Sequence, residues 1–248
     1  MDKRVVVVGG AQGIGAACVR SLAAEGAKVA SLDVSADKGR SAAQQAGAMF
    51  FECDVTNRDQ VFATMAEAAS ELGGIDSLVH VAGILAKGPA EEITDETWHR
   101  IMDVNARGPM LTNQAALPFL KKNDRSGIVN FASSAALAGY PDGALYAASK
   151  GAVVAWTKTI ALEWARFGIR ANVLHPSAHT PMFDDHRNKL SEEQREEYDR
   201  AMLAKVPLGG RFGDTDRDIA PVISFLVSDG ARFMTGQNIA VNGGYHLV

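Results

Sequence analysis

Residues 4–15 read Arg-Val-Val-Val-Val-Gly-Gly-Ala-Gln-Gly-Ile-Gly, an apolar run that passes directly into a turn rich in glycine. The apolar run predicts a buried strand, and the periodicity after the turn predicts a helix. Gly9, Gly13 and Gly15 have no side chains, so the turn can be tight and the N–H groups of the helix N-terminus can approach a pyrophosphate. Such a turn can also be purely structural, but its strand, its helix and an acidic residue downstream favour a dinucleotide-binding unit.

The acidic residue is Asp33, eighteen positions after Gly15 at the end of the second expected strand. Its carboxylate can accept hydrogen bonds from both hydroxyl groups of an adenosine ribose. A 2′-phosphate would meet a like charge there without an Arg to offset it, since the nearest basic residue after Asp33 is Lys38. Asp33 could instead cap the following helix, although Ser35 is available for that role. We therefore expect the cofactor to be NAD rather than NADP.

The composition of the chain excludes several classes of protein. With 47% hydrophobic and 22% charged residues, the 248-residue chain is typical of a globular protein rather than a disordered or fibrous one. Its net charge of −4 comes without a basic block, so we expect no nucleic-acid partner. No apolar run is long enough to span a bilayer, and the run at 5–8 is too short for a signal-peptide core, so we expect no membrane partner.

Cys18 and Cys53 are the two cysteines of the chain, a usage that fits a reducing compartment and a cytoplasmic location. Neither has a second Cys or a His at the spacing of metal ligands, so both are expected to pack as small buried groups. His175 and His179 are four residues apart, but the sequence offers no evident third ligand. We expect no metal site.

Short apolar runs alternate with stretches of helical periodicity along nearly the whole chain, an order typical of repeated βαβ units. We expect an α/β protein with a three-layer Rossmann fold, in which helices cover both faces of a seven-stranded parallel sheet. The expected strands are Arg4–Val8, Lys28–Leu32, Met49–Cys53, Ser77–His80, Gly127–Ala132, Arg170–Leu174 and Asn238–Val241. The expected helices are Ile14–Glu25, Ala36–Gln45, Arg58–Leu72, Asp95–Leu120, Leu145–Phe167, Glu192–Lys205 and Asp216–Val227.

No internal repeat, low-complexity tract or linker divides the chain, so we expect residues 1–248 to form a single dinucleotide-binding and catalytic domain. The segment 176–208 breaks the alternation and contains the charged stretch Asp184-Asp185-His186-Arg187. It follows the sixth expected strand and would lie at the carboxyl edge of the sheet, where open α/β folds bind ligands. We interpret 176–208 as a substrate-binding lid.

Four polar residues are candidates for catalysis. Tyr146 and Lys150 are four positions apart in an expected helix, so both side chains project from one face. Ser133 follows the fifth expected strand, where its hydroxyl would enter the same crevice, and Asn105 lies in an otherwise amphipathic helix. A phenol of pKa about 10 is a poor base at neutral pH, but a nearby ammonium favours the phenolate, and Lys150 would supply that charge.

Together these residues make the chain resemble the short-chain dehydrogenase/reductase family, in its compact single-domain branch, over essentially the entire length. The motifs in the family's order and spacing are Gly9–Gly15, Asp54-Val55, Ala82-Gly83, Asn105, Ser133 and Tyr146-Ala147-Ala148-Ser149-Lys150. The resemblance implies that Tyr146 is the general acid/base, that Lys150 lowers its pKa and holds the nicotinamide ribose, and that Ser133 orients the reacting oxygen. It also implies that Asn105 anchors a water molecule in the proton relay.

The resemblance further implies which residues surround the ligands. Those expected to bind the cofactor are Gly9, Gln12, Gly13, Ile14, Gly15, Asp33, Asp54, Val55, Val81, Ala82, Gly83, Tyr146, Lys150, Pro176, Ser177, His179 and Thr180. Those expected to contact the substrate are Ser133, Leu85, Tyr140, Tyr146, His179, Met182 and Phe183. The residues flanking the catalytic groups are mostly apolar, which favours a small, partly apolar substrate over a large polyanion.

The chain departs from the family pattern at five positions. Val8 stands where Thr is usual, His80 and Val81 where two Asn are usual, Ser177 where Gly is usual and Asn242 where Asp is usual. None of these changes removes a catalytic group. His80 could reach toward the adenosine side of the cofactor, but a histidine hydrogen-bonded at the end of its strand is the simpler interpretation.

We expect an NAD-dependent dehydrogenase that interconverts a secondary alcohol and a ketone by hydride transfer, with a Ser-Tyr-Lys-Asn proton relay. The first alternative is a 3-oxoacyl-thioester reductase of the same family, which shares these residues but usually takes NADPH, so Asp33 argues against it. The second is a dinucleotide-sensing protein without catalysis, which the intact catalytic residues disfavour. Apolar helices near 95–120 and 145–167 predict a homotetramer, as in relatives that pair these helices across two-fold axes.

Overall fold

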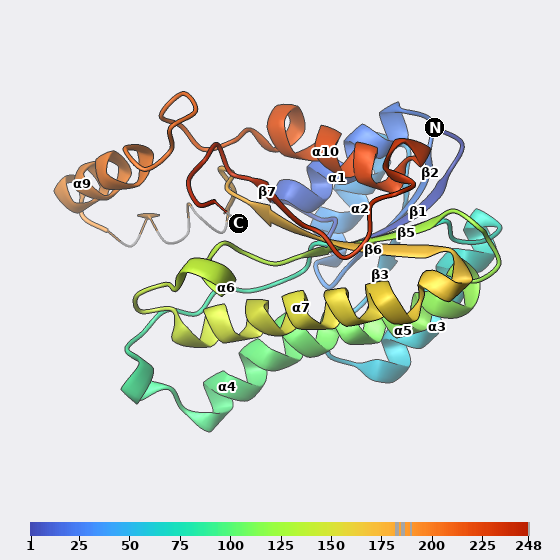
Figure 1. Ribbon diagram of the computed structural model, residues 1–248, viewed down its shortest axis with the longest axis horizontal. Helices are drawn as coiled ribbons and strands as arrows, with labels where there is room; N and C mark the ends of the chain where they lie inside the picture. The colour runs from blue at the N-terminus through green and yellow to red at the C-terminus, as the bar shows by residue number, and fades with distance from the viewer. Residues whose placement is uncertain (182–183, 185–186, 189, 248) are drawn as a thin grey trace.

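The computed structural model describes residues 1–181, 184, 187–188 and 190–247 (Figure 1). Its seven strands form one parallel sheet in the order β3-β2-β1-β4-β5-β6-β7, which confirms the expected fold class. The expected strand bounds agree with the structure to within two residues. The strands are β1 (Arg4–Val8), β2 (Lys28–Asp33), β3 (Met49–Glu52), β4 (Ser77–His80), β5 (Ser126–Phe131), β6 (Ile169–Pro176) and β7 (Asn238–Val241).

Helices cover both faces of the sheet, with α1 and α10 packed on one face and α3, α5 and α7 on the other (Figure 1). Successive side chains of a strand point to opposite faces, so Val5 and Val7 of β1 join the core with α1, whereas Val6 and Val8 join the core with α3. Because both faces of β1 are buried, its residues are apolar without alternation. The helices flanking the sheet are α1 (Gly13–Ala24), α2 (Ala36–Ala46), α3 (Arg58–Leu72), α5 (Gly108–Leu120), α7 (Ala144–Glu163) and α10 (Ala220–Val227), whereas α4 (Asp95–Met102) packs against α7.

The strand order reverses at β1. From β1 the chain continues outward to β2 and β3, and then crosses to β4 on the other side of β1. The segments that follow β1 and β4 therefore leave the sheet in opposite directions, which opens a crevice at the carboxyl ends of these two strands. The glycine-rich turn after β1 forms one wall of that crevice.

The prediction of a single helix over 95–120 is wrong. The structure divides this segment into α4, a π-helical turn (Asp103–Arg107) and α5. In this turn the N–H of Gly108 donates to the carbonyl of Asp103, five residues earlier. Pro109 has no N–H, so the carbonyl of Asn105 cannot receive the usual α-helical bond from residue 109. Asn105 therefore lies in a widened turn rather than in a regular helix.

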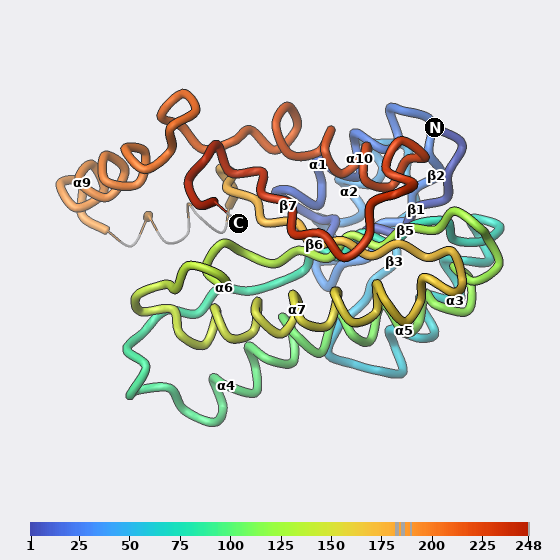
Figure 2. Tube along the Cα trace, in the orientation of Figure 1, coloured from blue at the N-terminus to red at the C-terminus, as the bar shows by residue number. Residues whose placement is uncertain are grey.

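Two further segments near the carboxyl edge refine the expected pattern. The helix expected from Asp216 begins as a π-helical turn (Thr215–Ile219) that leads into α10. The amphipathic segment expected at 192–205 forms α9 (Glu192–Leu203), whose first turn is closed by reciprocal bonds between Ser191 and Gln194. α9 lies beyond the carboxyl ends of β6 and β7, away from the body of the sheet (Figures 1 and 2).

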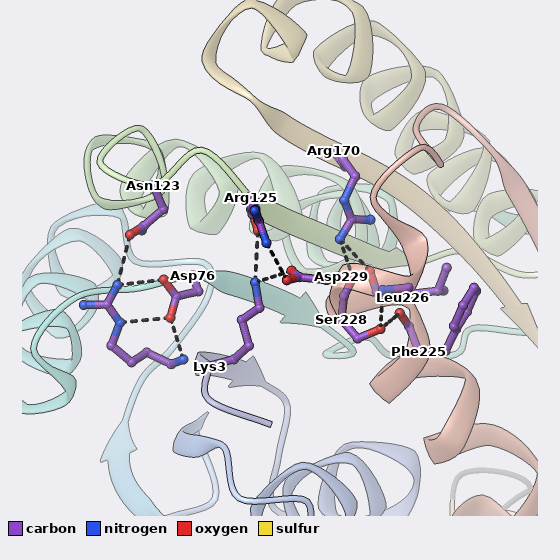
Figure 3. A network of polar contacts seen from close by, with 11 residues as sticks. Lys3, Asp76, Asn123, Arg125, Arg170, Phe225, Leu226, Ser228 and Asp229 are labelled. Atoms are coloured by element: carbon purple, nitrogen blue, oxygen red, sulfur yellow. Dashed lines mark hydrogen bonds and ion pairs between the residues drawn. The ribbon is translucent and has the colours of Figure 1, made fainter.

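The amino edge of the sheet carries a network of ion pairs (Figure 3). Arg4, at the start of β1, donates from Nε and Nη2 to the carboxylate of Asp76, at 2.9 and 2.6 Å. Burial opposes ionisation of Asp76, but the hydrogen bonds and charge of Arg4 outweigh it and hold the pKa of that carboxyl below its usual value. Lys3 and Arg125 both contact Asp229, each at 2.9 Å. This edge is held together by matched charges.

Candidate active site

A cavity of about 420 Å³ lies at the carboxyl ends of the strands, bounded by the segments that follow β1, β2, β3, β4 and β6 and by α7. Most residues expected to bind the cofactor line it, because the carboxyl ends of parallel strands meet at one edge of a sheet. They are Gly9, Gln12, Gly13, Ile14, Asp33, Asp54, Val55, Val81, Ala82, Gly83, Tyr146, Lys150, Pro176 and Thr180.

The glycine-rich turn is shaped by close backbone approaches. Gly9 has φ of +86°, and a Cβ there would lie 2.5 Å from the amide nitrogen of Ala82. A Cβ on Gly15 would lie 1.8 Å from the carbonyl oxygen of Gly9, so only glycine allows α1 to start this close to β1. Gly15 does not line the cavity and lies behind the turn. Its part in the site is to place the N-terminus of α1 against the cavity.

Asp33 ends β2 with its carboxylate at the cavity wall. Oδ2 accepts the N–H of Ala11 at 3.0 Å, and Oδ1 accepts the N–H of Ser35 at 2.9 Å. The carboxylate thus bridges the glycine-rich turn and the approach to α2, while the Ser35 side chain makes no cap bond to that helix. A carboxylate accepts about four hydrogen bonds, so these two contacts orient Asp33 and leave capacity for ligand hydroxyl groups.

Tyr146 and Lys150 project from α7 toward the cavity. The Lys150 side chain is buried, its Nζ donates to the carbonyl of Phe131 at 3.0 Å, and burial lowers its pKa to about 8. Burial also raises the pKa of Tyr146 to about 12, an effect that a hydrogen bond with Ser133 partly offsets. Nζ lies 6.0 Å from the centroid of the Tyr146 ring. The structure therefore brings three of the four candidate residues together.

The fourth candidate, Asn105, is fully buried in the π-helical turn next to them. Oδ1 accepts the N–H of Ile84 at 2.8 Å, and Nδ2 donates to the carbonyl of Ile84 at 2.8 Å and to Oγ of Ser149 at 3.1 Å. Ser149 in turn donates to the carbonyl of Tyr146 at 2.8 Å. The Asn105 side chain thus joins the loop after β4 to the first turns of α7.

Comparison with known proteins shows what kind of chain this is. A family model described as Enoyl-(Acyl carrier protein) reductase matches residues 9–246. The chain is 41% identical to inactive 2-(S)-hydroxypropyl-CoM dehydrogenase 2 of Xanthobacter autotrophicus, over 91% of this chain and 97% of that protein. It is 36% identical to cyclopentanol dehydrogenase of Comamonas testosteroni, over 98% of this chain and 97% of that protein. The chain belongs to the short-chain dehydrogenase/reductase family.

Other members of the family include reductases. The 3-oxoacyl-[acyl-carrier-protein] reductase of Thermotoga maritima is 36% identical over 98% of this chain and 97% of that protein. A solved structure of the Brucella melitensis 3-ketoacyl reductase complexed with NADH matches with a TM-score of 0.88 at 29% identity, over 99% of this chain and 98% of that chain. The actinorhodin polyketide ketoreductase with NADPH matches with a TM-score of 0.91 at 30% identity, over 98% and 97%. Dehydrogenases and reductases of this kind identify the chain as an oxidoreductase, and its structural neighbours bind nicotinamide dinucleotides.

His80, which departs from the family pattern, is a buried residue at the end of β4. Its Nδ1 shares a hydrogen bond of 2.8 Å with Oγ1 of Thr112 in α5, which confirms the interpretation of a hydrogen-bonded histidine. Burial, followed by the charge of Lys150, lowers the pKa of His80 to about 3, so the ring is neutral. Asn113 and Asn130 exchange bonds of 3.1 and 2.9 Å nearby, so the central strands are braced from α5.

The residues expected to contact the substrate are only partly brought together. Tyr140 meets the ring of Tyr146 edge to face, with centroids 6.4 Å apart, and Leu85 is half-buried in the loop after β4. His179 is exposed, and its Nε2 lies 3.4 Å from Asp184 beside a shallow depression next to the cavity. Met182 and Phe183 lie outside the described residues.

Ser177, expected to bind the cofactor, does not line the cavity. Its N–H donates to the carbonyl of Val241 at 3.0 Å, and its carbonyl accepts the N–H of Gly213 at 2.9 Å. These backbone bonds tie the chain just after β6 to β7 and to the segment before α10. Ser177 therefore fixes the path of the chain beside the cavity.

Sequence reasoning missed several residues that line the cavity. They are Val8, Leu32, Val34, Ser35, Cys53, Ile84, Val104, Phe131, Ala132 and Pro181. Most of them lie at or next to the carboxyl end of a strand, a position that could have been read from the expected strand bounds. They add a largely apolar lining to the polar groups.

The described residues contain neither a candidate metal cluster nor a candidate membrane-spanning helix. No group of three or more His, Cys, Asp or Glu among them is arranged to hold a metal ion. His175 is buried, and its Nε2 shares a hydrogen bond of 3.1 Å with Oδ1 of Asn238, whereas His179 is exposed. In the same part of the chain, no helix has both the length and the apolar character that crossing a bilayer requires.

Proposed function

We propose that this protein is an NAD-dependent oxidoreductase that interconverts a secondary alcohol and a ketone on a small, partly apolar substrate. The observation that carries the proposal is a buried Lys150 ammonium beside Tyr146, in the same cavity that exposes the Asp33 carboxylate. Residues 1–248 would act as a single dinucleotide-binding and catalytic domain, with 176–208 as the substrate-binding lid.

A nicotinamide dinucleotide fits the residues of the cavity. The N–H groups at the start of α1 suit its pyrophosphate, because the missing side chains of Gly9 and Gly13 keep the turn open there. Asp33 would accept the adenosine ribose hydroxyls, and Lys150 would donate to those of the nicotinamide ribose. When bound, the cofactor supplies the hydride acceptor for oxidation and the hydride donor for reduction.

Tyr146 is the residue proposed to move the proton. Its Oη would accept the proton of the alcohol in oxidation and return it to the carbonyl oxygen in reduction. Burial favours the neutral phenol. The Lys150 ammonium, 6.0 Å from the ring centroid, would favour the phenolate and so assist proton transfer near neutral pH. Ser133, hydrogen-bonded to Tyr146, would orient the reacting oxygen.

Asn105 is proposed to anchor a water molecule in the relay behind Lys150. Both polar atoms of its side chain are already engaged with Ile84 and Ser149. Its main-chain carbonyl has no donor at position 109, because that residue is Pro109. The backbone of Asn105, rather than its side chain, therefore supports the proposed water site.

The preference for NAD rests on the charge of Asp33. A 2′-phosphate next to this carboxylate would add a like charge at close range. Lys38 is the nearby cation, and its Nζ donates to Oε1 of Gln12 at 3.2 Å. Arg20 borders the neighbouring depression but makes a two-pronged pair with Asp216. These partners support NAD over NADP.

The relatives support two further candidates. The 3-oxoacyl-[acyl-carrier-protein] reductase of Thermotoga maritima keeps a thioester reductase as the alternative, which a preference for NADPH would favour. The relative named as inactive keeps a dinucleotide-sensing protein without catalysis as the second alternative. Against that second reading, Ser133, Tyr146 and Lys150 are all present and adjacent.

We also propose that the protein is a cytoplasmic homotetramer. Leu162 of α7, Phe225 of α10 and Phe233 are large apolar side chains on the surface, with exposed fractions of 81%, 45% and 102%. Exposed apolar side chains of this size are available to pack against another subunit. Light scattering is expected to give the mass of four chains, and a monomer mass would contradict the proposal.

A paired titration with NADH and NADPH, followed by turnover on a panel of secondary alcohols, tests the proposed function. We expect tighter binding of NADH, and a loss of about 10³-fold in kcat/KM for Tyr146→Phe, because the general acid/base is removed. Preference for NADPH would favour the thioester reductase. Binding of the cofactor without turnover of any alcohol or ketone would favour the sensor.

A further inference from the structure

We propose that His80, acting through Thr112, holds the π-helical turn that carries Asn105. The turn places the Asn105 side chain beside the proposed acid/base, so His80 is a positioning residue of the site rather than a catalytic one. The inference deepens the proposed function and rests on it, because Asn105 is proposed to take part in the proton relay. His80 is one of the positions where the chain departs from the pattern of its family, and no proposed catalytic step uses it.

The hydrogen bonds of Thr112 indicate which nitrogen of His80 carries the proton. The Thr112 hydroxyl lies 3.2 Å from the carbonyl oxygens of Gly108 and Pro109. These oxygens can only accept, so the single hydrogen of the hydroxyl is shared between them. The hydroxyl oxygen, 2.8 Å from Nδ1 of His80, is then the acceptor for Nδ1–H. A series of hydrogen bonds therefore runs from the end of β4 through Thr112 to the start of α5.

The ring of His80 is neutral and fully buried. Burial lowers its pKa to about 3, the charge of Lys150 adds to this effect, and the backbone of Ala82 opposes it. A neutral ring carries one N–H, and Nε2, which is then a bare acceptor, has no hydrogen-bond partner among the described residues. A buried acceptor without a partner destabilises the fold. Stability alone therefore does not explain an imidazole at this position.

The series of hydrogen bonds ends where the helix is interrupted. Gly108 closes the π-helical turn by donating to the carbonyl of Asp103, and Pro109 has no N–H with which to continue the regular pattern. The Thr112 hydroxyl contacts the carbonyls of both Gly108 and Pro109. His80 and Thr112 are buried, so bulk solvent does not compete for these bonds. The imidazole and the hydroxyl together clamp the turn between β4 and α5.

Asn105 connects the clamped turn to the reacting groups. Its Nδ2 donates to Oγ of Ser149, which donates to the carbonyl of Tyr146. A Cβ on Gly83 would lie 3.1 Å from Nζ of Lys150 and 3.2 Å from Oδ1 of Asn105, so the ammonium and the amide lie around one backbone position. A turn that lost its clamp would shift this amide relative to both the ammonium and the phenol.

A pair of substitutions at Thr112 tests the inference. Thr112→Val removes the hydroxyl and keeps the shape of the side chain, whereas Thr112→Ser keeps the hydroxyl. Thr157→Val is the matched control, because Thr157 is also a buried helical residue bonded to a strand. Its hydroxyl donates to the carbonyl of Val153 at 2.7 Å and accepts from Nδ2 of Asn130 in β5 at 3.0 Å.

The expected result is a loss of rate rather than of cofactor binding. We expect kcat to fall about tenfold in Thr112→Val, with the affinity for NADH changed less than about threefold, because a relay group is displaced. The solvent deuterium isotope effect on kcat should increase, since proton transfer becomes more nearly rate-limiting. Thr112→Ser and the control should keep kcat within about twofold of the wild type.

Substitutions of His80 itself provide a rescue test. His80→Leu removes the donor and should repeat the effects of Thr112→Val on kcat and on the isotope effect. His80→Asn keeps an N–H donor near the place of Nδ1 and should restore most of the rate. Wild-type values of kcat in His80→Leu would overturn the inference.

The pKa of Lys150 gives a readout that needs no turnover. Burial lowers it to about 8. Tyr146 and His80 lie close to Lys150, and both are neutral at that pH, with pKa values of about 12 and about 3. A displaced amide would admit water to the ammonium, so the pKa should rise toward its ordinary 10.5 in Thr112→Val but not in the serine variant or the control. Carbon-13 NMR of lysine labelled at Cε measures it.

The two readouts separate this inference from the proposed function. A raised Lys150 pKa in Thr112→Val, with no turnover by the wild type, would support the inference and contradict the proposed function. Turnover by the wild type, with kcat and the Lys150 pKa both unchanged in Thr112→Val, would support the function and overturn the inference. Equal changes in Thr112→Val and Thr157→Val would also overturn it, because they would mean that the Thr112 hydroxyl only braces a helix.

Discussion

Charged side chains have different partners at the two edges of the sheet. At the amino edge, Arg4 meets Asp76 and Lys3 meets Asp229, so opposite charges are matched within the chain (Figure 3). At the carboxyl edge, Lys150 is buried against a backbone carbonyl, and Asp33 is held by backbone N–H groups. Matched charges hold the strands together, whereas charges kept apart are available to a ligand.

The pKa shifts at the two edges have opposite consequences. At Asp76 the lowered pKa means that folding favours the charged form, because Arg4 outweighs the burial. At Lys150 the pKa lowered to about 8 means that folding disfavours the charged form, because burial is the cause. One charge therefore stabilises the fold, and the other is kept at a cost to stability. Substitutions at the two edges should separate these effects.

The largest expected effect is the loss of activity in Lys150→Met. Removing the ammonium leaves Tyr146 without the charge that favours its phenolate, so we expect kcat/KM to fall by about 10³-fold or more. The midpoint of thermal unfolding should stay unchanged or rise, because a buried charge is replaced by an apolar group of similar length. Calorimetry and initial rates on one preparation check both. A large loss of thermal stability would mean that Lys150 is chiefly structural.

A second large effect concerns the cofactor. Asp33→Ser removes the carboxylate that would repel a 2′-phosphate and accept the ribose hydroxyls, so the ratio of NADH to NADPH affinity should fall about 100-fold. Fluorescence titration with both cofactors measures the ratio. Asp37→Ser, an acidic residue in the first turn of α2, is the matched control and should change the ratio less than about threefold. An unchanged ratio in Asp33→Ser would remove the argument for NAD.

At the amino edge the expected effect is on stability alone. Asp76→Ala leaves the partly buried Arg4 guanidinium without its carboxylate, so the free energy of unfolding should fall by about 2 kcal/mol. Asp229→Ala, whose ion pairs are more exposed, should cost less than about 1 kcal/mol. Denaturant unfolding measures both, and kcat/KM should stay within about twofold of the wild type. A loss of activity in Asp76→Ala would contradict the separation of the two edges.

A further difference between the two edges is in the pH dependence of stability. The folded-state pKa of Asp76 is below its ordinary 3.8, so its contribution is complete above that value and is lost as the pH falls through the lowered folded-state value. Between pH 8 and 10.5 the unfolded chain holds the Lys150 proton more tightly, so the cost of that charge disappears as the pH rises. Unfolding of wild type, Asp76→Asn and Lys150→Met across pH checks both directions. Parallel curves would show that neither charge is linked to folding.

Much of this arrangement could be predicted from the sequence. The strands follow from apolar runs that are buried on both faces, and their shared carboxyl edge follows from the parallel order. Asp33, Tyr146 and Lys150 were predicted because each has a fixed offset from a strand or a helix face. Local spacing is sufficient where secondary structure alone determines which way a side chain points.

The remainder depends on contacts between distant segments. The π-helical turn at Asn105 was missed because the hydrophobic periodicity continues through it, although Pro109 is a local sign of the change. The contacts of Lys87 with the rings of Tyr140 and Tyr198 could not be predicted, because the two tyrosines belong to separate elements. The spacing of residues within one element does not predict contacts between separate elements.

The position of β1 in the middle of the sheet also affects how the chain folds. Val5 pairs with Val29 on one side, but its partner on the other side is Ser77. The segment between Val5 and Ser77 must close into a loop before β1 and β4 can pair. Such non-local closure is slower than helix formation. β7 pairs with β6 at the outer edge and completes the sheet last in chain order. During synthesis, the strands bearing the glycine-rich turn and Asp33 can therefore pair before residues 176–208 have been made.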